Sequence, residues 1–266
     1  MSVGFTNNLN IPDFSCLTEV VRKQQEVMLP IIEAVQAFKR VLEPISKYSD
    51  TIRANVLGFA QTMVEVFKPI NAVNRLSQAQ YVCCHSMGSS FVDAIVSSTN
   101  VDDTIIAALV EDDYASVKYA ISQIENHPFV EKHARVYAQA VNAYNMGWYD
   151  LAVNGFTSLL DGLLSDVSGN HITNFGRRLQ PIYDKIDAGE VLDSEEHISF
   201  SLAATFQKTI ETFTQKAPFT EPEPEGLNRH WIAHGRSTRE KTQLDAIKMI
   251  NMIYGLLLIC DVDAMK

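Results

Sequence analysis

The chain has 266 residues, of which 46% are hydrophobic and 20% charged, and it carries a formal net charge of −10. This length suffices for one large or two small domains with a real core, and the composition is that of a soluble globular protein. The acidic balance, with a pI near 5.1, excludes a protein that coats nucleic acid through its whole surface. A nucleic-acid site in this chain would therefore have to be a local basic patch.

The cysteines and the apolar runs bear on the compartment. The four cysteines are Cys16, Cys83, Cys84 and Cys260, and they show no metal-site spacing. We interpret them as buried free thiols in a reducing compartment. Met1 to Asn10 lacks a signal-peptide pattern, and the apolar run from Ile250 to Ile259 is too short to span a bilayer. We therefore expect a cytoplasmic protein without membrane contact.

The first hundred residues show apolar side chains at helical spacing. The pattern starts near Val20 and is interrupted by Pro30, Pro44 and Pro69. We interpret residues 1–100 as an amphipathic helical module that packs, dimerises or regulates the rest of the chain. The small polar run 97–100 predicts a boundary, with a second domain over residues 101–266.

The second domain is predicted to consist of helices. The expected helices are one opened by Asp102-Asp103, then Tyr114–Ile124, Phe129–Met146, Tyr149–Val167, a short one within 171–192, one over 194–216, and Thr238–Val262. Gly147-Trp148 joins two of them into a helical hairpin. No segment has the alternation of a strand, so the predicted fold class is all-α: a helical bundle with an additional N-terminal helical module.

The motif with most chemistry is the octet Asn-Arg-His-Trp-Ile-Ala-His-Gly at 228–235, which follows an acidic proline loop, Pro218 to Gly226. Arg229 offers a fixed fork of donors for phosphate oxygens, and His230 and His234 exchange protons near neutral pH. On a helix, His230 and His234 share a face, and Arg229 lies roughly 140° round from His234.

Basic residues also gather around the octet. Between Gly226 and Lys248, the bases Arg229, Arg236, Arg239, Lys241 and Lys248 outnumber the acids Glu240 and Asp245. This predicts a local basic patch in an acidic protein. The doublet Arg177-Arg178 offers a further contact to a phosphodiester backbone, although a solvated helix face is the more typical interpretation of such a doublet.

The string Asn-Arg-His-x-Ile-x-His-Gly resembles the HEPN superfamily, named for higher eukaryote and prokaryote nucleotide-binding domains. In that superfamily an Arg-x4–6-His motif marks RNA-cleaving helical bundles. The bare Arg-to-His spacing is weak, since it arises by chance about once in such a chain, so the resemblance depends on the fuller string. It implies a homodimer with a composite, metal-independent RNA-cleaving site in which Arg229 clamps the phosphate and His234 is general base or acid.

The resemblance also implies supporting residues and partners. Asn228 and His230 would orient the catalytic groups or bind the RNA backbone. Asp161, on the second helix of the hairpin, would point toward the motif and fix a rotamer or tautomer, unless it is a surface carboxylate between apolar stripes. Arg236 would contact substrate; it stands where antitoxin-paired members carry a tyrosine, so modification at that position is not expected. No cofactor or metal is required, and an antitoxin or regulatory protein is an expected partner.

The predicted function is thus an endoribonuclease of toxin or antiphage-defence type. One alternative is a non-catalytic RNA-binding, nucleotide-binding or protein-interaction module of the same fold. Another is zinc bound by His230 and His234, although Trp231 replaces the glutamate of metalloproteases and no third ligand is evident. A last alternative is a purely structural helix start, with Arg229 tied to the acidic loop.

Overall fold

The structure is a computed structural model that describes residues 67–84, 87–168, 175–187 and 196–261. The chain divides into two compact units, Met1–Phe67 and Lys68–Lys266, and every described residue except Phe67 belongs to the second. Most of the expected N-terminal module, with Cys16, lies outside the described residues. The expected boundary between residues 100 and 101 stays a prediction.

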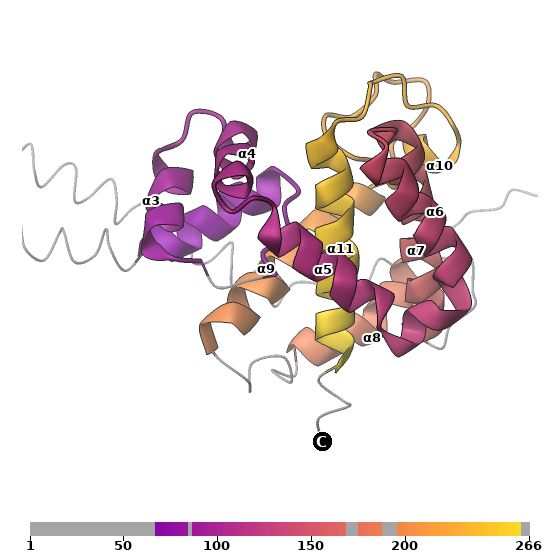
Figure 1. The fold of residues 1–266 in the computed structure, drawn as a ribbon, viewed down its shortest axis with the longest axis horizontal. Coiled ribbons are helices and arrows are strands. Elements are labelled where there is room, and N and C mark those ends of the chain that lie inside the picture. The colour runs from indigo at the N-terminus through magenta and orange to yellow at the C-terminus, as the bar shows by residue number, and fades with distance from the viewer. Residues whose placement is uncertain (1–66, 85–86, 169–174, 188–195, 262–266) are drawn as a thin grey trace, which may run out of the picture. The chain divides into compact units, whose positions relative to one another are not determined.

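All regular elements of the described residues are helices, and the all-α prediction is confirmed. Residues 67–78 are helical. They are followed by α3 (Ser89–Ser97), α4 (Val101–Glu111), α5 (Ala115–Glu125), the 3₁₀ helix η1 (Pro128–His133), α6 (Ala134–Asn145), α7 (Tyr149–Val167), α8 (Phe175–Asp187), α9 (Glu196–Thr214), α10 (Arg229–Ala233) and α11 (Gln243–Asp261) (Figure 1).

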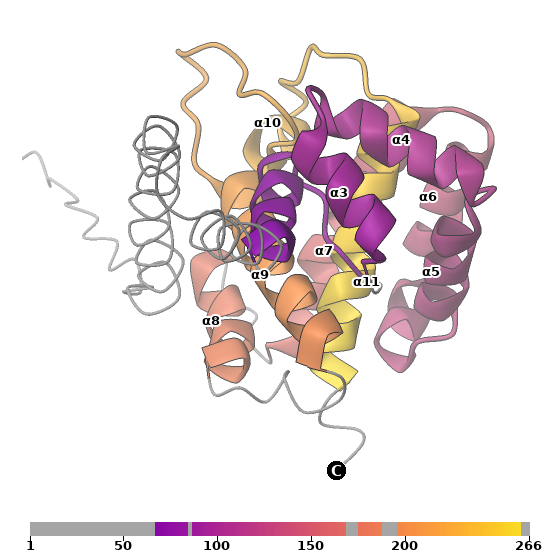
Figure 2. The same ribbon diagram turned by 90° about the vertical axis from the view of Figure 1, so that its left-hand side faces the viewer.

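Helix α11 is the central helix of this unit. It lies between α9 and α5 (Figure 2) and also packs on α7 and α8. Apolar side chains cover its circumference, as expected for a helix inside a bundle, and they include Leu244, Ile247, Ile250, Ile253 and Leu257. The window Gln243–Cys260 is long and apolar enough to cross a membrane, but 89% of it is buried inside the fold, as in a core helix.

The hairpin of α6 and α7 forms where the sequence predicts it. Gly147 supplies the left-handed turn residue, with φ of 74°. The two helices approach closely because Gly155 has no side chain: a Cβ there would lie 2.8 Å from the Cβ of Ala140. At the other end, His133 Nε2 lies 2.6 Å from Asp166 Oδ2 and ties η1 to α7.

Two predicted helix starts are corrected. The helix expected from Phe129 begins as the 3₁₀ turn η1, because Pro128 opens it and the His127 ring accepts the backbone N–H of Phe129. The last helix begins at Gln243 instead of Thr238. Asp245 accepts the N–H of Thr242 at 2.8 Å, and Thr242 Oγ1 accepts the N–H of Asp245 at 3.2 Å, so this capping box sets the start of α11.

The close approach at Gly155 yields a test of the hairpin. We expect Gly155→Ala to lower the free energy of unfolding by about 1–3 kcal/mol, because the added methyl group clashes with Ala140. This loss should outweigh the gain of about 1 kcal/mol in helix propensity. Ser158→Ala, on the exposed side of the same helix, is the control and should change stability by less than about 0.5 kcal/mol in urea denaturation. A more stable Gly155→Ala protein would contradict this packing.

Candidate functional site

The octet forms one short helix, α10, that is capped at both ends. At its start, Asn228 Oδ1 accepts the backbone N–H groups of His230 at 3.1 Å and Trp231 at 3.2 Å. At its end, Gly235 adopts φ of 62°, and the N–H of Arg236 donates to the Trp231 carbonyl at 2.9 Å in a Schellman arrangement. The Asn and the Gly of the motif are therefore explained by the capping of a five-residue helix.

Asn228 is held on both sides of its amide. Besides capping α10, its Nδ2 donates to the carbonyl of Gln215 at 2.9 Å, and only 4% of the residue is exposed. This geometry gives Asn228 a structural role, and both expected roles, orienting the catalytic groups and binding the RNA backbone, stay predictions. Asn228 fixes where α10 starts and thereby where Arg229 leaves the helix.

Asp161 on α7 connects the octet to two neighbouring helices. Its Oδ2 pairs with Arg229 Nη2 at 3.3 Å, and its Oδ1 pairs with Arg178 Nη1, from α8, at 2.9 Å. Arg178 also donates to the Asp161 carbonyl at 3.2 Å. Asp161 thus points toward the octet, as the resemblance implies. Because it has two guanidinium partners, this group of three side chains keeps a net positive charge.

The expectation of a solvated helix face is wrong for Arg178, since its side chain is only 10% exposed. The side chain of Arg177 lies outside the described residues. Arg229 pairs with Asp161 on α7, and the alternative that ties it to the acidic loop stays a prediction. The buried position of Arg178 was readable from its spacing: Ile182, four residues on, is also buried, so both lie on the inner face of α8.

The two histidines lie together on another side of α10. Their ring centroids are 4.7 Å apart at an angle of 72°, as expected for residues four apart on a helix. Phe219, from the acidic loop, stacks on His230 with centroids 4.4 Å apart and planes within 3°. It also meets the His234 ring edge-on at 5.5 Å. Arg229 reaches α7 while His234 lies against Phe219, so the two side chains leave α10 toward different neighbours.

The surroundings of His230 are cationic. Burial of the ring, together with the charges of His234, Arg229 and Lys216, lowers the pKa of His230 below its usual range. The cations contribute because each one repels a proton on the imidazole. His230 therefore stays neutral to lower pH than an ordinary histidine, which suits a group that accepts a proton.

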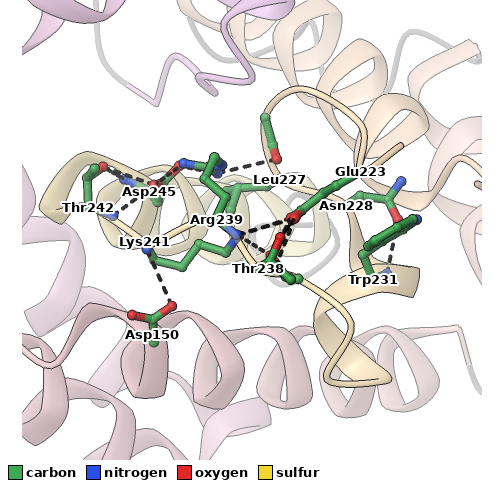
Figure 3. Close-up of polar contacts among 12 residues, drawn as sticks. Asp150, Glu223, Leu227, Asn228, Trp231, Thr238, Arg239, Lys241, Thr242 and Asp245 are labelled. Carbon is green, nitrogen blue, oxygen red and sulfur yellow. Dashed lines mark hydrogen bonds and ion pairs between the residues drawn. The ribbon is translucent and has the colours of Figure 1, made fainter. Parts of the chain in front are cut away.

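A second polar cluster holds the acidic loop against the segment after α10 (Figure 3), and we call it the Glu223 clasp. Glu223 accepts the N–H groups of Thr238 at 2.9 Å and Arg239 at 3.3 Å, as well as the Ser237 hydroxyl. Lys241 Nζ lies 3.6 Å from the same carboxylate, and its side chain is only 3% exposed. Burial opposes ionisation of Glu223, but these donors prevail and bring its pKa to about 2.

The expected basic patch is largely neutralised by ion pairs. Four of its five bases pair with acids: Arg229 with Asp161, Arg239 with Asp245, Lys241 with Glu223, and Lys248 with Asp102. Arg236 is the exposed one, and its guanidinium carbon lies 5.2 Å from the centre of the Phe219 ring. The exposed positive charge of this run is therefore that of Arg236, beside the Phe219 ring, and not that of the run as a whole.

The described residues include no group of three or more His, Cys, Asp or Glu side chains placed to hold a metal. The chemistry that the site offers is proton exchange by two imidazoles and anion binding by cations. Two contributors, Lys216 and Phe219, were not predicted from the sequence, and Arg178 was singled out only as part of a basic doublet. Phe219 carries no pattern that predicts its position, because nothing in a proline loop shows where its one aromatic ring will pack.

The Glu223 clasp can be tested by its effect on stability. We expect Glu223→Gln to lower the free energy of unfolding by about 2–4 kcal/mol, because buried Lys241 loses its counter-charge. This difference should shrink as the pH falls from 4.5 toward 2. Above pH 4.5 the depressed pKa stabilises the folded state, and protonation of Glu223 removes that contribution. Glu221→Gln, at an exposed position of the same loop, should leave urea denaturation unchanged, and equal losses in both variants would contradict the clasp.

Comparison with known proteins assigns no family to this all-helical chain: no family model, no curated protein and no solved structure matches it.

Proposed function

We propose that this chain is a metal-independent endoribonuclease of the HEPN type, acting as a toxin or in antiphage defence. It would cleave RNA by attack of the 2′-hydroxyl in a composite site made by two copies of the chain. The proposal is supported by the octet, by the Asp161–Arg229 pair and by the all-helical fold.

The observation that carries the proposal is the cationic surrounding of two touching imidazoles. His230 contacts His234, and the charges that help to lower the pKa of His230 are those of His234, Arg229 and Lys216, each of which is positive when charged. Gathering like charges costs free energy, and a bound anion removes that cost. A phosphodiester is such an anion, and its cleavage needs a general base and a general acid, which are roles that an imidazole can take.

The residues then take these roles. The neutral imidazole of His230 accepts the proton of the 2′-hydroxyl, whose oxygen attacks phosphorus. The bond from phosphorus to the 5′-oxygen breaks, and a protonated His234 gives its proton to that oxygen. The products are a 2′,3′-cyclic phosphate and a 5′-hydroxyl. Arg229, held by Asp161, binds the phosphate oxygens as negative charge builds up on them.

The contact between the two rings argues for a second copy. In-line displacement places the base and the acid on opposite sides of phosphorus. His230 and His234 of one chain touch, with centroids 4.7 Å apart, and leave no room for a phosphate between them. The acid is therefore assigned to His234 of a second copy, related by a twofold axis.

A second candidate is an RNA-binding module without turnover. The ion pair of Arg229 with Asp161 favours it, because a paired guanidinium has less charge to offer a transition state. This candidate predicts that Arg229→Ala weakens RNA binding in a protein that cleaves nothing.

The proposal predicts RNA cleavage in the presence of EDTA. His234→Ala and His230→Ala should each lower kcat by about 100-fold or more, because each removes a proton-transfer group. Arg135→Ala is the matched control, since Arg135 is exposed on α6, and it should cleave like the unaltered protein. Equal cleavage by all four proteins would point to a contaminating nuclease and overturn the proposal.

The pH dependence tests His230 as the base. The acid limb of kcat/KM should lie below pH 6.5, because the base must be neutral and its pKa is lowered. Lys216→Gln removes one of the repelling charges, so it should raise the pKa of His230 and move the acid limb to higher pH. NMR titration of the His230 ring checks the same shift without turnover, with Arg135→Gln as control. A limb that stays in place in Lys216→Gln would exclude His230 as the base.

A further inference from the structure

Phe219 is placed beside the imidazole pair by the fold. The ring stacks flat on His230, meets Trp231 and His234 edge-on at 5.4 and 5.5 Å, and lies beneath the Arg236 guanidinium. Even so, 36% of Phe219 remains exposed. A single exposed aromatic residue is ordinary, but an exposed ring beside an exposed guanidinium is a surface suited to stacking.

The loop that carries Phe219 is anchored on both sides of it. On one side, the N–H of Glu221 donates to the Pro218 carbonyl at 3.2 Å and closes a turn around Phe219. On the other, the Glu223 clasp fixes the loop to Ser237 and Thr238. The exposed ring is therefore held in place before any ligand arrives, so binding would cost little additional ordering.

The chemistry of the cluster matches a nucleotide. Planar rings and guanidinium groups stack on nucleobases of any sequence, each base contributing about 1–3 kcal/mol. Cations beside them bind the phosphate that the base carries, and here the Arg236 guanidinium supplies that charge. In double-stranded RNA the bases are stacked inside the helix and unavailable, whereas single strands present them.

We propose that Phe219, with His230 and Arg236, forms a platform that takes an unpaired nucleobase next to the cleaved phosphate, so that the substrate is single-stranded RNA. This inference rests on the proposed function and deepens it. The platform selects for strandedness and is tolerant of sequence, because stacking reads no hydrogen-bonding edge.

The test compares two short, labelled single strands with 2′-O-methyl groups, which remove the attacking hydroxyl and prevent cleavage. One strand carries bases, and the other is the same backbone without bases. Fluorescence anisotropy should show the base-carrying strand binding roughly 10-fold or more tightly. Phe219→Leu and Phe219→Ala should abolish this difference and leave the affinity for the abasic strand unchanged. Leucine keeps the apolar packing and lacks the aromatic face, so it separates stacking from loop anchoring.

The place of binding is checked by intrinsic fluorescence. The chain has two tryptophans, and Trp148→Phe, at an exposed position, leaves Trp231 beside Phe219 as the reporter. Quenching by the base-carrying strand but not by the abasic strand is the expected result.

The results of these binding and cleavage experiments separate a failure of the stacking platform from a failure of the proposed nuclease. Equal affinity for both strands, or an equal loss for both in Phe219→Leu, overturns the platform. If His234→Ala still abolishes cleavage in that case, the proposed nuclease activity is retained and only the platform is rejected. If neither strand binds and no RNA is cleaved in EDTA, both are wrong, and a protein partner for this surface becomes the better explanation.

Discussion

Asp161 holds one guanidinium from α8 and one from α10, and the geometry of the candidate site follows from this shared carboxylate. A helix of five residues is not stable in isolation, because its few hydrogen bonds barely offset the free-energy cost of helix nucleation. Helix α10 persists because its ends are capped, its Trp231 and Ile232 are buried, and its Arg229 is tied to α7. The pair is partly exposed and contributes modest free energy. Its larger consequence is the fixed direction of Arg229.

The ion pairs around this point redistribute charge. Arg239 pairs with Asp245, and Lys241 pairs with Glu223. These bases, which the sequence predicts to form a basic surface, instead fix the loops around α10. Close to the imidazoles, two guanidiniums share the Asp161 carboxylate, and Arg236 is exposed beside Phe219. In a protein with a formal net charge of −10, the bases at α10 are thus placed by individual contacts and do not form a basic run.

The sequence predicts the parts of this arrangement that depend on local periodicity. Helix α7 has the predicted bounds because its apolar residues repeat over five turns, and the same periodicity places Asp161 among them. The start of α11 was misplaced although its signal is local, because the capping box Thr242-x-x-Asp245 was overlooked. What depends on contacts between distant segments was not predictable, and Phe219 was missed because its position comes from packing on α10. Arg178 lies between these cases, since the spacing to Ile182 indicates a buried position but not its partner.

The touching histidines set the condition under which the proposed catalysis works. A base and an acid that act on one phosphate must flank it, and one α10 carries both on the same side. Two copies that bring two such faces together place cations opposite cations, and this arrangement costs free energy. An RNA strand between the faces supplies negative charge at that point, so under the proposed function the substrate itself lowers the local cost of the twofold arrangement in which it is cleaved.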